Sequence, residues 1–165
     1  MKIKSVVIKE PGQLVIDEHE ISQPLPGEVR VKVQLAGICG SDVHIYRGHN
    51  PFAKYPRVIG HEFFGVVDAV GEGVSADKLG KRVSVDPVIS CGHCYPCQIG
   101  RPNVCKELTV LGVHRDGGFS ESACVPAGNA HEIADHITDE MAVMIEPFTI
   151  AANICEQLKP TSLDT

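Results

Sequence analysis

Four closely spaced cysteines restrict the fold of this chain more than any other feature of its sequence. Cys91, Cys94 and Cys97 are each separated by two residues, and Cys105 follows after seven more. Such short loops allow four sulfurs to converge on one tetrahedral zinc through bonds of ~2.3 Å, with no position left for a substrate. The alternative, four unconnected thiols packed as small hydrophobic groups, does not explain this spacing. The sequence therefore predicts a structural zinc lobe over residues 88–106.

The other cysteines and the histidine inside the lobe are interpreted differently. Because four sulfurs already satisfy the metal, His93 is expected to be solvated. Cys124 follows a strand pattern and Cys155 a helical one, and neither has a partner at metal-ligand spacing, so both are expected to be core thiols. Seven cysteines in a chain that opens with a strand rather than a signal sequence favour metal binding over disulfides, because the cytoplasm keeps thiols reduced.

Composition excludes several classes of protein. The chain has 165 residues, enough for one domain with a conventional core, and a formal net charge of -6. Acidic and basic residues are interspersed, so no basic face is expected to bind nucleic acid. No apolar run is long enough to span a bilayer, and Met1 to Lys4 lead directly into a strand. We expect a cytoplasmic protein with no membrane or nucleic-acid partner.

Apolar residues alternate with polar ones through residues 3–38, which is the period of β-strands. Turn residues at Pro11-Gly12 and Pro24 to Gly27 divide this region into a meander, and 16 glycines and 11 prolines continue to punctuate the later chain. A mainly β fold, a barrel with few helices, is therefore predicted. The best helical stretch begins after Thr138, a potential cap, and Pro147 should kink or end it.

The apolar run from Gly60 to Val67 is interrupted by His61 and Glu62. Burying these polar groups requires either a hydrogen-bond network around a core histidine or a metal. Cys39 upstream and Glu146 downstream favour the metal. A thiolate, an imidazole and a carboxylate from distant segments leave a fourth zinc position open, which is typical of a catalytic site.

These motifs together resemble those of the zinc-dependent medium-chain alcohol dehydrogenases, and most closely their sorbitol and threonine dehydrogenase branch. The resemblance extends over residues 1–155 and is carried by the cysteine lobe, the stretches Ala36 to Asp42 and Pro56 to Glu62, and the signature Gly60-His61-Glu62-x2-Gly65-x5-Gly71-x2-Val74. It implies a GroES-like β-barrel catalytic domain and an NAD or NADP cofactor in the full-length protein. The expected reaction is oxidation of a secondary alcohol, such as a polyol, sugar or sugar acid, or reduction of the matching ketone.

The resemblance also implies a role for each residue of the second metal site. Cys39 and His61 would bind the catalytic zinc, and Glu62 and Glu146 would compete for the remaining protein position. Asp42 resembles the carboxylate that orients the ligand histidine and fixes its tautomer, although a turn cap is an alternative. Two zinc ions per chain are therefore expected.

Further residues resemble the proton relay and the substrate cleft of the family. Ser41 would receive the proton of the zinc-bound alcohol and His44 would pass it on, so both are candidate catalytic residues alongside Glu62. A helix-capping serine and a surface histidine are the alternatives. Phe119 resembles an aromatic residue that lines the substrate cleft, but a buried strand phenylalanine fits its context nearly as well.

One part of the family pattern is absent from this sequence. No strand followed by Gly-x-Gly-x-x-Gly and a helix occurs, and Gly71-Glu72-Gly73 belongs to the zinc signature. We expect residues 156–165 to lead towards a missing nucleotide-binding Rossmann domain, this fragment alone to be inactive, and the full-length protein to form a homo-oligomer. The alternative function is a non-catalytic zinc module that serves assembly or regulation.

Overall fold

The structure, a computed structural model, describes residues 1–160. Strands dominate the first 132 residues, and helices dominate the remainder. The strands are β1 (Lys2–Glu10), β2 (Gln13–Glu20), β3 (Glu28–Gly37), β4 (Arg57–Val58), β5 (Glu62–Val70), β6 (Arg82–Val85), β7 (Val88–Ile89), β8 (Thr109–Val110), β9 (Ser122–Pro126) and β10 (Ala130–Glu132). The helices are α1 (Gly40–Tyr46), α2 (Tyr95–Gln98), α3 (Asp139–Val143) and α4 (Ile145–Leu158), with short 3-10 turns at Ala76–Lys78, Pro102–Val104 and Ala127–Asn129.

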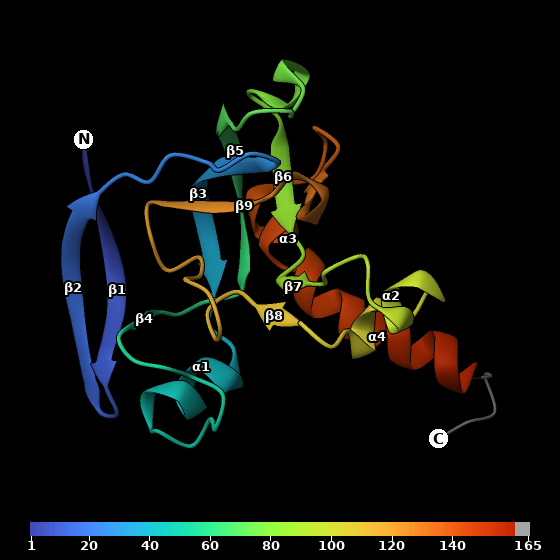
Figure 1. Cartoon of the computed structure of the whole chain (residues 1–165), viewed down its shortest axis with the longest axis horizontal. Coiled ribbons are helices and arrows are strands. Elements are labelled where there is room, and N and C mark those ends of the chain that lie inside the picture. The colour runs from blue at the N-terminus through green and yellow to red at the C-terminus, as the bar shows by residue number, and fades with distance from the viewer. Residues whose placement is uncertain (161–165) are drawn as a thin grey trace.

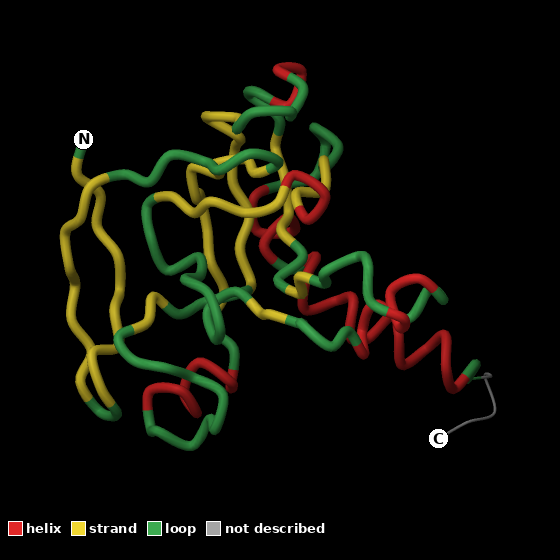
Figure 2. Tube along the Cα trace, viewed as in Figure 1, coloured by secondary structure: helices red, strands yellow, loops and turns green. Residues whose placement is uncertain are grey.

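The strands form a curled half-barrel. The central antiparallel sheet has the order β10-β6-β5-β3-β9, and a second sheet, β2-β1-β4, stands beside it (Figures 1 and 2). The segment before β9 connects the two sheets, because Val6 N–H donates to the Phe119 carbonyl at 2.7 Å and Val33 N–H donates to the Glu121 carbonyl at 3.1 Å. The small β7-β8 sheet leads out to the cysteine lobe. The predicted mainly β, barrel-like fold is confirmed.

Strand β5 lies in the middle of the central sheet, between β6 and β3. Its neighbouring residues Phe63 and Phe64 point to opposite faces, and they are only 1% and 0% exposed. Phe63 belongs to the main hydrophobic cluster, together with valines of β3, β5, β6 and β9. Strand β2 differs, because its Leu14 and Ile16 remain 51% and 71% exposed. The strand that carries the Gly60 to Val67 motif is thus held from both sides.

Three glycine backbones pack directly against one another at the entrance to β5. Gly60 has a φ of +92°, and a Cβ there would lie 2.2 Å from the Phe119 ring. A Cβ on Gly112 would lie 2.9 Å from the backbone of Gly60, and one on Gly117 would lie 2.0 Å from the Gly60 carbonyl oxygen. Gly118 N–H also donates to this oxygen at 2.8 Å. The chain before His61 is therefore fixed largely by close backbone contacts.

The helical prediction near the end of the chain is confirmed in its main points. Thr138 caps α3 and accepts a hydrogen bond from Met141 N–H at 3.3 Å. The helix ends before Pro147, and Met144 separates it from α4, whose first turn contains the proline. Helix α4 continues past residue 155 to Leu158. Residues 161–165 of the expected tail lie outside the described residues.

Cys155 and helix α1 differ from the sequence interpretation. The core-thiol prediction for Cys155 is wrong, because α4 packs on the sheet only through its first turns and Cys155 is exposed. Cys124 is half-buried, and burial raises the pKa of its thiol to about 11. Helix α1 had not been singled out by its sequence, which offers only seven residues and no clear apolar stripe.

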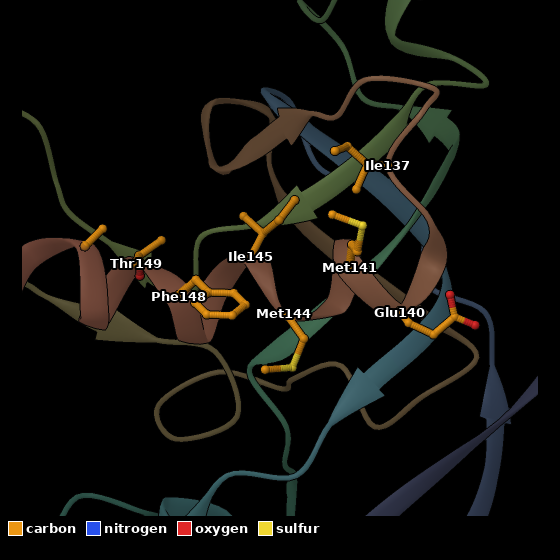
Figure 3. A pocket seen from close by; sticks show the side chains of 8 residues that line it. Ile137, Glu140, Met141, Met144, Ile145, Phe148 and Thr149 are labelled. Carbon is orange, nitrogen blue, oxygen red and sulfur yellow. The ribbon is translucent and has the colours of Figure 1, made fainter.

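An apolar hollow of about 510 Å³ lies along α3 and the start of α4 (Figure 3). Its walls are mostly the side chains of Ile137, Met141, Met144, Ile145 and Phe148. Across residues 1–160, no helix combines the length and apolar character that a membrane crossing requires.

Candidate metal centres

Strand pairing brings Cys39 and His61 together although they are 22 positions apart. Strands β3 and β5 are antiparallel neighbours in which Gly37 pairs with Glu62, so the residues that follow β3 meet those that precede β5. The ligand atoms of Cys39, His61 and Glu62 all lie within 4.8 Å of one another. We call these three residues the mixed cluster. It combines a thiol, an imidazole and a carboxylate, which is a donor set that suits zinc.

Asp42 is the buried polar residue beneath the mixed cluster, with a side chain that is only 2% exposed. Its carboxylate accepts hydrogen bonds from Cys39 N–H at 3.0 Å and from Gly60 N–H at 3.2 Å. It therefore joins the start of α1 to the turn before β5. Asp42 also caps α1, so the turn-cap alternative and the orienting role use the same carboxylate.

The imidazole of His61 has Asp42 beside one ring nitrogen and Ser41 beside the other. Its Nδ1 lies 3.5 Å from Asp42 Oδ1 and is buried, with no hydrogen-bond partner in the described chain. Its Nε2 lies 3.5 Å from the Ser41 hydroxyl. The contact with Asp42 raises the pKa of His61 to about 9, although burial opposes this shift. An imidazole oriented by a carboxylate at one nitrogen presents the other nitrogen to a metal, so the residues fit zinc.

The two candidate carboxylates approach from different elements. Glu62 starts β5 and belongs to the mixed cluster, whereas Glu146 lies in the first turn of α4 and outside the 4.8 Å group. Charges in the mixed cluster nonetheless affect the pKa of Glu146. Burial raises the pKa of Glu146, the charge of His61 lowers it, and the charges of Glu62 and Asp86 raise it further.

The remaining predicted site residues occupy three different environments. Ser41 is partly buried beside His61, in the first turn of α1. His44 lies on the same helix but is exposed, and its ring centroid is 6.1 Å from that of His49. Phe119 packs against the small hydrophobic cluster around Ile45 and over Gly60, so the structure places it as a half-buried aromatic next to the motif.

The cysteine lobe brings its four sulfurs together as predicted. The sulfurs of Cys91, Cys94, Cys97 and Cys105 lie within 4.8 Å of one another. The distance from Cys94 Sγ is 3.5 Å to Cys97 Sγ and 3.8 Å to Cys105 Sγ. A tetrahedron with bonds of ~2.3 Å has edges of about 3.8 Å, so these spacings suit one zinc ion.

Backbone groups prepare the lobe for thiolates. Cys91 N–H and Glu107 N–H both donate to Cys105 Sγ at 3.3 Å. Hydrogen bonds from the backbone of Lys106 and of Cys97 lower the pKa of Cys94 to about 6, whereas burial and the Cys94 side chain raise the pKa of Cys97 to about 11. His93 can group with Cys91 and Glu107, but its side chain is 72% exposed, in agreement with its prediction as a solvated residue.

Gly37 is a site residue that the sequence interpretation missed. A Cβ at this position would lie 2.6 Å from Glu62 Oε2, so the glycine makes room for the carboxylate of the mixed cluster. The signal was available, because a glycine near the end of an alternating strand often marks close approach by another group. Asp86 and His131 were also missed. They line a cavity of about 330 Å³ with Glu146.

A family model and several relatives match this chain. The model of the alcohol dehydrogenase GroES-like domain matches residues 25–135. The chain belongs to this family. Starvation-sensing protein RspB of Escherichia coli K12 is 69% identical over 163 residues, which are 99% of this chain and 48% of RspB. The crystal structure of rspB from E. coli CFT073, described as a short chain alcohol dehydrogenase complexed with NADH, has a TM-score of 0.94 at 67% identity and covers 99% of this chain and 48% of that one.

Two further relatives carry informative names. L-galactonate-5-dehydrogenase of E. coli K12 is 41% identical over 148 residues, 90% of this chain and 43% of the relative. An uncharacterized zinc-type alcohol dehydrogenase-like protein of Haemophilus influenzae is 42% identical over 151 residues, 91% of this chain and 44% of the relative. The chain thus spans about half the length of the curated relatives it matches. The expected family, zinc-type alcohol dehydrogenases with nicotinamide cofactors among its solved members, is confirmed.

Proposed function

We propose that this chain is the zinc-binding catalytic part of an NAD- or NADP-dependent oxidoreductase that acts on a secondary alcohol. The observation that carries the proposal is the mixed cluster of Cys39, His61 and Glu62, which lies apart from a complete four-sulfur site. A module that used zinc only for its fold has no need of a second, incomplete donor set. Support for a polyol, sugar or sugar-acid substrate comes from the similarity to L-galactonate-5-dehydrogenase.

In the proposed mechanism, Cys39 and His61 would bind the catalytic zinc, and Glu62 and Glu146 would compete for the remaining protein position. Zinc supplies Lewis acidity that lowers the pKa of the substrate hydroxyl. Asp42 holds the imidazole of His61 by its Nδ1 side and anchors the backbone before it, which fixes the direction of Nε2.

Ser41 and His44 are proposed to carry the proton away. The Ser41 hydroxyl lies 3.5 Å from His61 Nε2, so it stands beside the position where an alcohol oxygen would bind. His44 is exposed one turn later on α1, where it can exchange a proton with solvent. Ser41→Ala is expected to lower turnover and to leave zinc binding unchanged, because the hydroxyl is not a proposed zinc ligand.

Metal content tests the proposal directly. We expect two zinc ions per chain, whereas a non-catalytic module would hold one. Glu146→Ala and Glu62→Ala are expected to weaken the second zinc and to leave the lobe zinc in place, because the two sites share no ligand. The larger loss identifies the carboxylate that binds directly. Removal of both metals by either variant would argue against independent sites.

The nicotinamide cofactor and the fold that holds it are proposed for the full-length protein. In this 165-residue chain we expect zinc binding without NADH formation from secondary alcohols. Positioning of the cofactor carbon at about 3–3.5 Å from the alcohol supplies roughly 7–11 kcal/mol of the barrier reduction in such reactions. Turnover by the purified chain that disappears in Cys39→Ser would overturn this expectation.

A further inference from the structure

Arg82 is a mostly buried cation that binds the start of the helical segment that carries Glu146. It opens β6, and its side chain is 22% exposed. Its guanidinium carbon lies 5.6 Å from the centroid of the fully buried Phe64 ring. This stacking holds the plane of the guanidinium against the central sheet. The donor groups at its far end therefore point in a fixed direction.

Those donor groups bind the loop and the helix start that follow β10. One terminal nitrogen donates to the carbonyl of Ile137 at 2.8 Å, and the other donates to Asp139 Oδ1 at 2.8 Å. The carbonyls of Ala134 and Asp135 lie 3.5 Å from the first nitrogen. A planar fork can reach a carbonyl and a carboxylate two residues apart in this way.

The segment that Arg82 holds is short and leads directly to Glu146. Helix α3 has five residues, with Thr138 as its cap and Asp139 as its first residue. Its buried Ala142 packs on the sheet, because α3 contacts β3 and β5. The chain turns at Met144 and enters α4, where Glu146 is the second residue.

Little else fixes α4 in the described chain. Its residues from Phe148 onward are exposed, and the helix contacts β5 and β6 only near its start. Figure 3 shows α3 and the start of α4 side by side along the apolar hollow. The position of Glu146 therefore depends on how firmly the preceding helix is attached.

We propose that Arg82 is a positioning residue that sets the carboxylate of Glu146 against the catalytic zinc, through its hydrogen bonds to Ile137 and Asp139. The inference rests on the proposed function, in which Glu146 faces that zinc. Arg82 itself does not touch the mixed cluster. Its effect is transmitted along α3 and the turn at Met144.

A double-mutant cycle on zinc affinity tests this inference. Zinc is titrated into the full chain with the lobe already loaded, in competition with a chromogenic chelator, for Arg82→Gln, Glu146→Ala and the combination. We expect Arg82→Gln to weaken the second zinc about tenfold, the lower end of what supporting residues around metal sites contribute. In the Glu146→Ala background the same change should have less than about a twofold effect, since the residue through which Arg82 acts is gone.

Arg30→Gln is the matched control. Arg30 is similarly buried, at 13% exposure, and makes the same kind of contacts, a fork to Asp68 and a hydrogen bond to the Ser22 carbonyl. Its side-chain partners, Asp68 and Ser22, belong to neither α3 nor α4, so its loss should not change zinc affinity. Asp139→Asn, at an exposed carboxylate, is a milder second variant in case Arg82→Gln unfolds, and should act in the same direction.

The outcomes separate the inference from the proposed function. An equal effect of Arg82→Gln with and without Glu146, or an equal effect of Arg30→Gln, would show a general loss of stability and overturn the positioning role. If Glu146→Ala alone leaves zinc affinity unchanged, Glu146 is not near the metal, and both the ligand assignment and the inference fail. A zinc effect that requires Glu146 supports both.

Discussion

The cysteine lobe takes all four of its sulfurs from fifteen consecutive residues, whereas the residues of the proposed catalytic centre, Cys39, His61 and Glu146, together span more than a hundred positions. The lobe has little core of its own, because Tyr95, Ile99 and Val104 are all more than half exposed. The mixed cluster instead lies at the start of β5, the middle strand of the central sheet. We therefore expect zinc to stabilise the fold of the lobe, whereas at the mixed cluster the folded sheet positions the zinc ligands.

The largest expected effect comes from removing one ligand of the lobe. Cys97→Ser should abolish protection of residues 91–105 from amide hydrogen exchange, because zinc can contribute on the order of 10–16 kcal/mol to such small structures. The strands of the central sheet should keep their protection. Cys124→Ser, at a half-buried thiol outside the lobe, is the control. A lobe that stayed protected without zinc would show that it has a core after all.

A core substitution should have the reverse pattern. Phe63→Ala removes a side chain that is 1% exposed, and such changes cost about 3–5 kcal/mol. We expect chemical denaturation to show this loss, with weaker zinc binding at the mixed cluster because Glu62 is the adjacent residue, and with the lobe zinc retained. Phe52→Ala, at a residue that is 66% exposed, should change little. Loss of the lobe zinc in Phe63→Ala would mean that the two regions are coupled.

Zinc binding at the mixed cluster should also depend on pH. In the metal-free protein Asp42 raises the pKa of His61 from 6.5 to about 9, so zinc must displace a proton at neutral pH. Deprotonation of His61 alone should therefore raise zinc affinity at the mixed cluster about tenfold per pH unit from pH 7 to 9. This group should cause no further rise above pH 9. Zinc titration across this range measures the slope. Asp42→Asn should move the rise to lower pH.

The same shift has the opposite sign for the stability of the metal-free protein. The protonated form of His61 is favoured by folding, so this stabilisation is fully present below about pH 6.5 and is lost as the pH rises through about 9. Denaturation in the presence of a chelator at several pH values would detect it. Stability that increased across that interval in the wild type, relative to Asp42→Asn, would contradict the contact between these two residues.

The smallest predicted effect tests how finely the chain shapes the mixed cluster. Gly37→Ala should displace the Glu62 carboxylate, because the new Cβ would lie 2.6 Å from Oε2. We expect zinc affinity to fall a few-fold, with stability changed by less than about 1 kcal/mol, since alanine suits a strand at least as well as glycine. Gly128→Ala is the control, because open space surrounds that position. No change in affinity would indicate that Glu62 moves freely.

The sequence predicted the local site more completely than the long-range one. Four cysteines within one loop can reach each other whatever the rest of the chain does, so their spacing alone was sufficient. The approach of Cys39 to His61 depends on the pairing of β3 with β5, which includes two register shifts. The motif named these residues, but no pattern in the sequence encoded the pairing.

The prediction was least complete where tertiary contacts decide. Alternation identified the strands, and Thr138 and Pro147 located the break between α3 and α4. Helix α1 was missed because its cap depends on Asp42, which Gly60 N–H also holds from a distant segment. The core prediction for Cys155 was wrong because a helical pattern does not tell whether that part of the helix packs against the rest of the protein. The roles of all the site residues stay predictions: Cys39, Ser41, Asp42, His44, His61, Glu62, Phe119, Glu146 and the four cysteines of the lobe.

The contact of Gly60 with Gly112 and Gly117 affects how genetic data on this protein should be interpreted. A saturation mutagenesis map would show a patch of intolerant positions next to His61 in which no side chain performs chemistry. Alanine at Gly112 or Gly117 would abolish function by pushing the Gly60 backbone, and with it the imidazole, out of place. Intolerance in this patch would measure crowding of the main chain, and such variants should regain function from compensating changes in neighbouring loops, which true ligand variants would not.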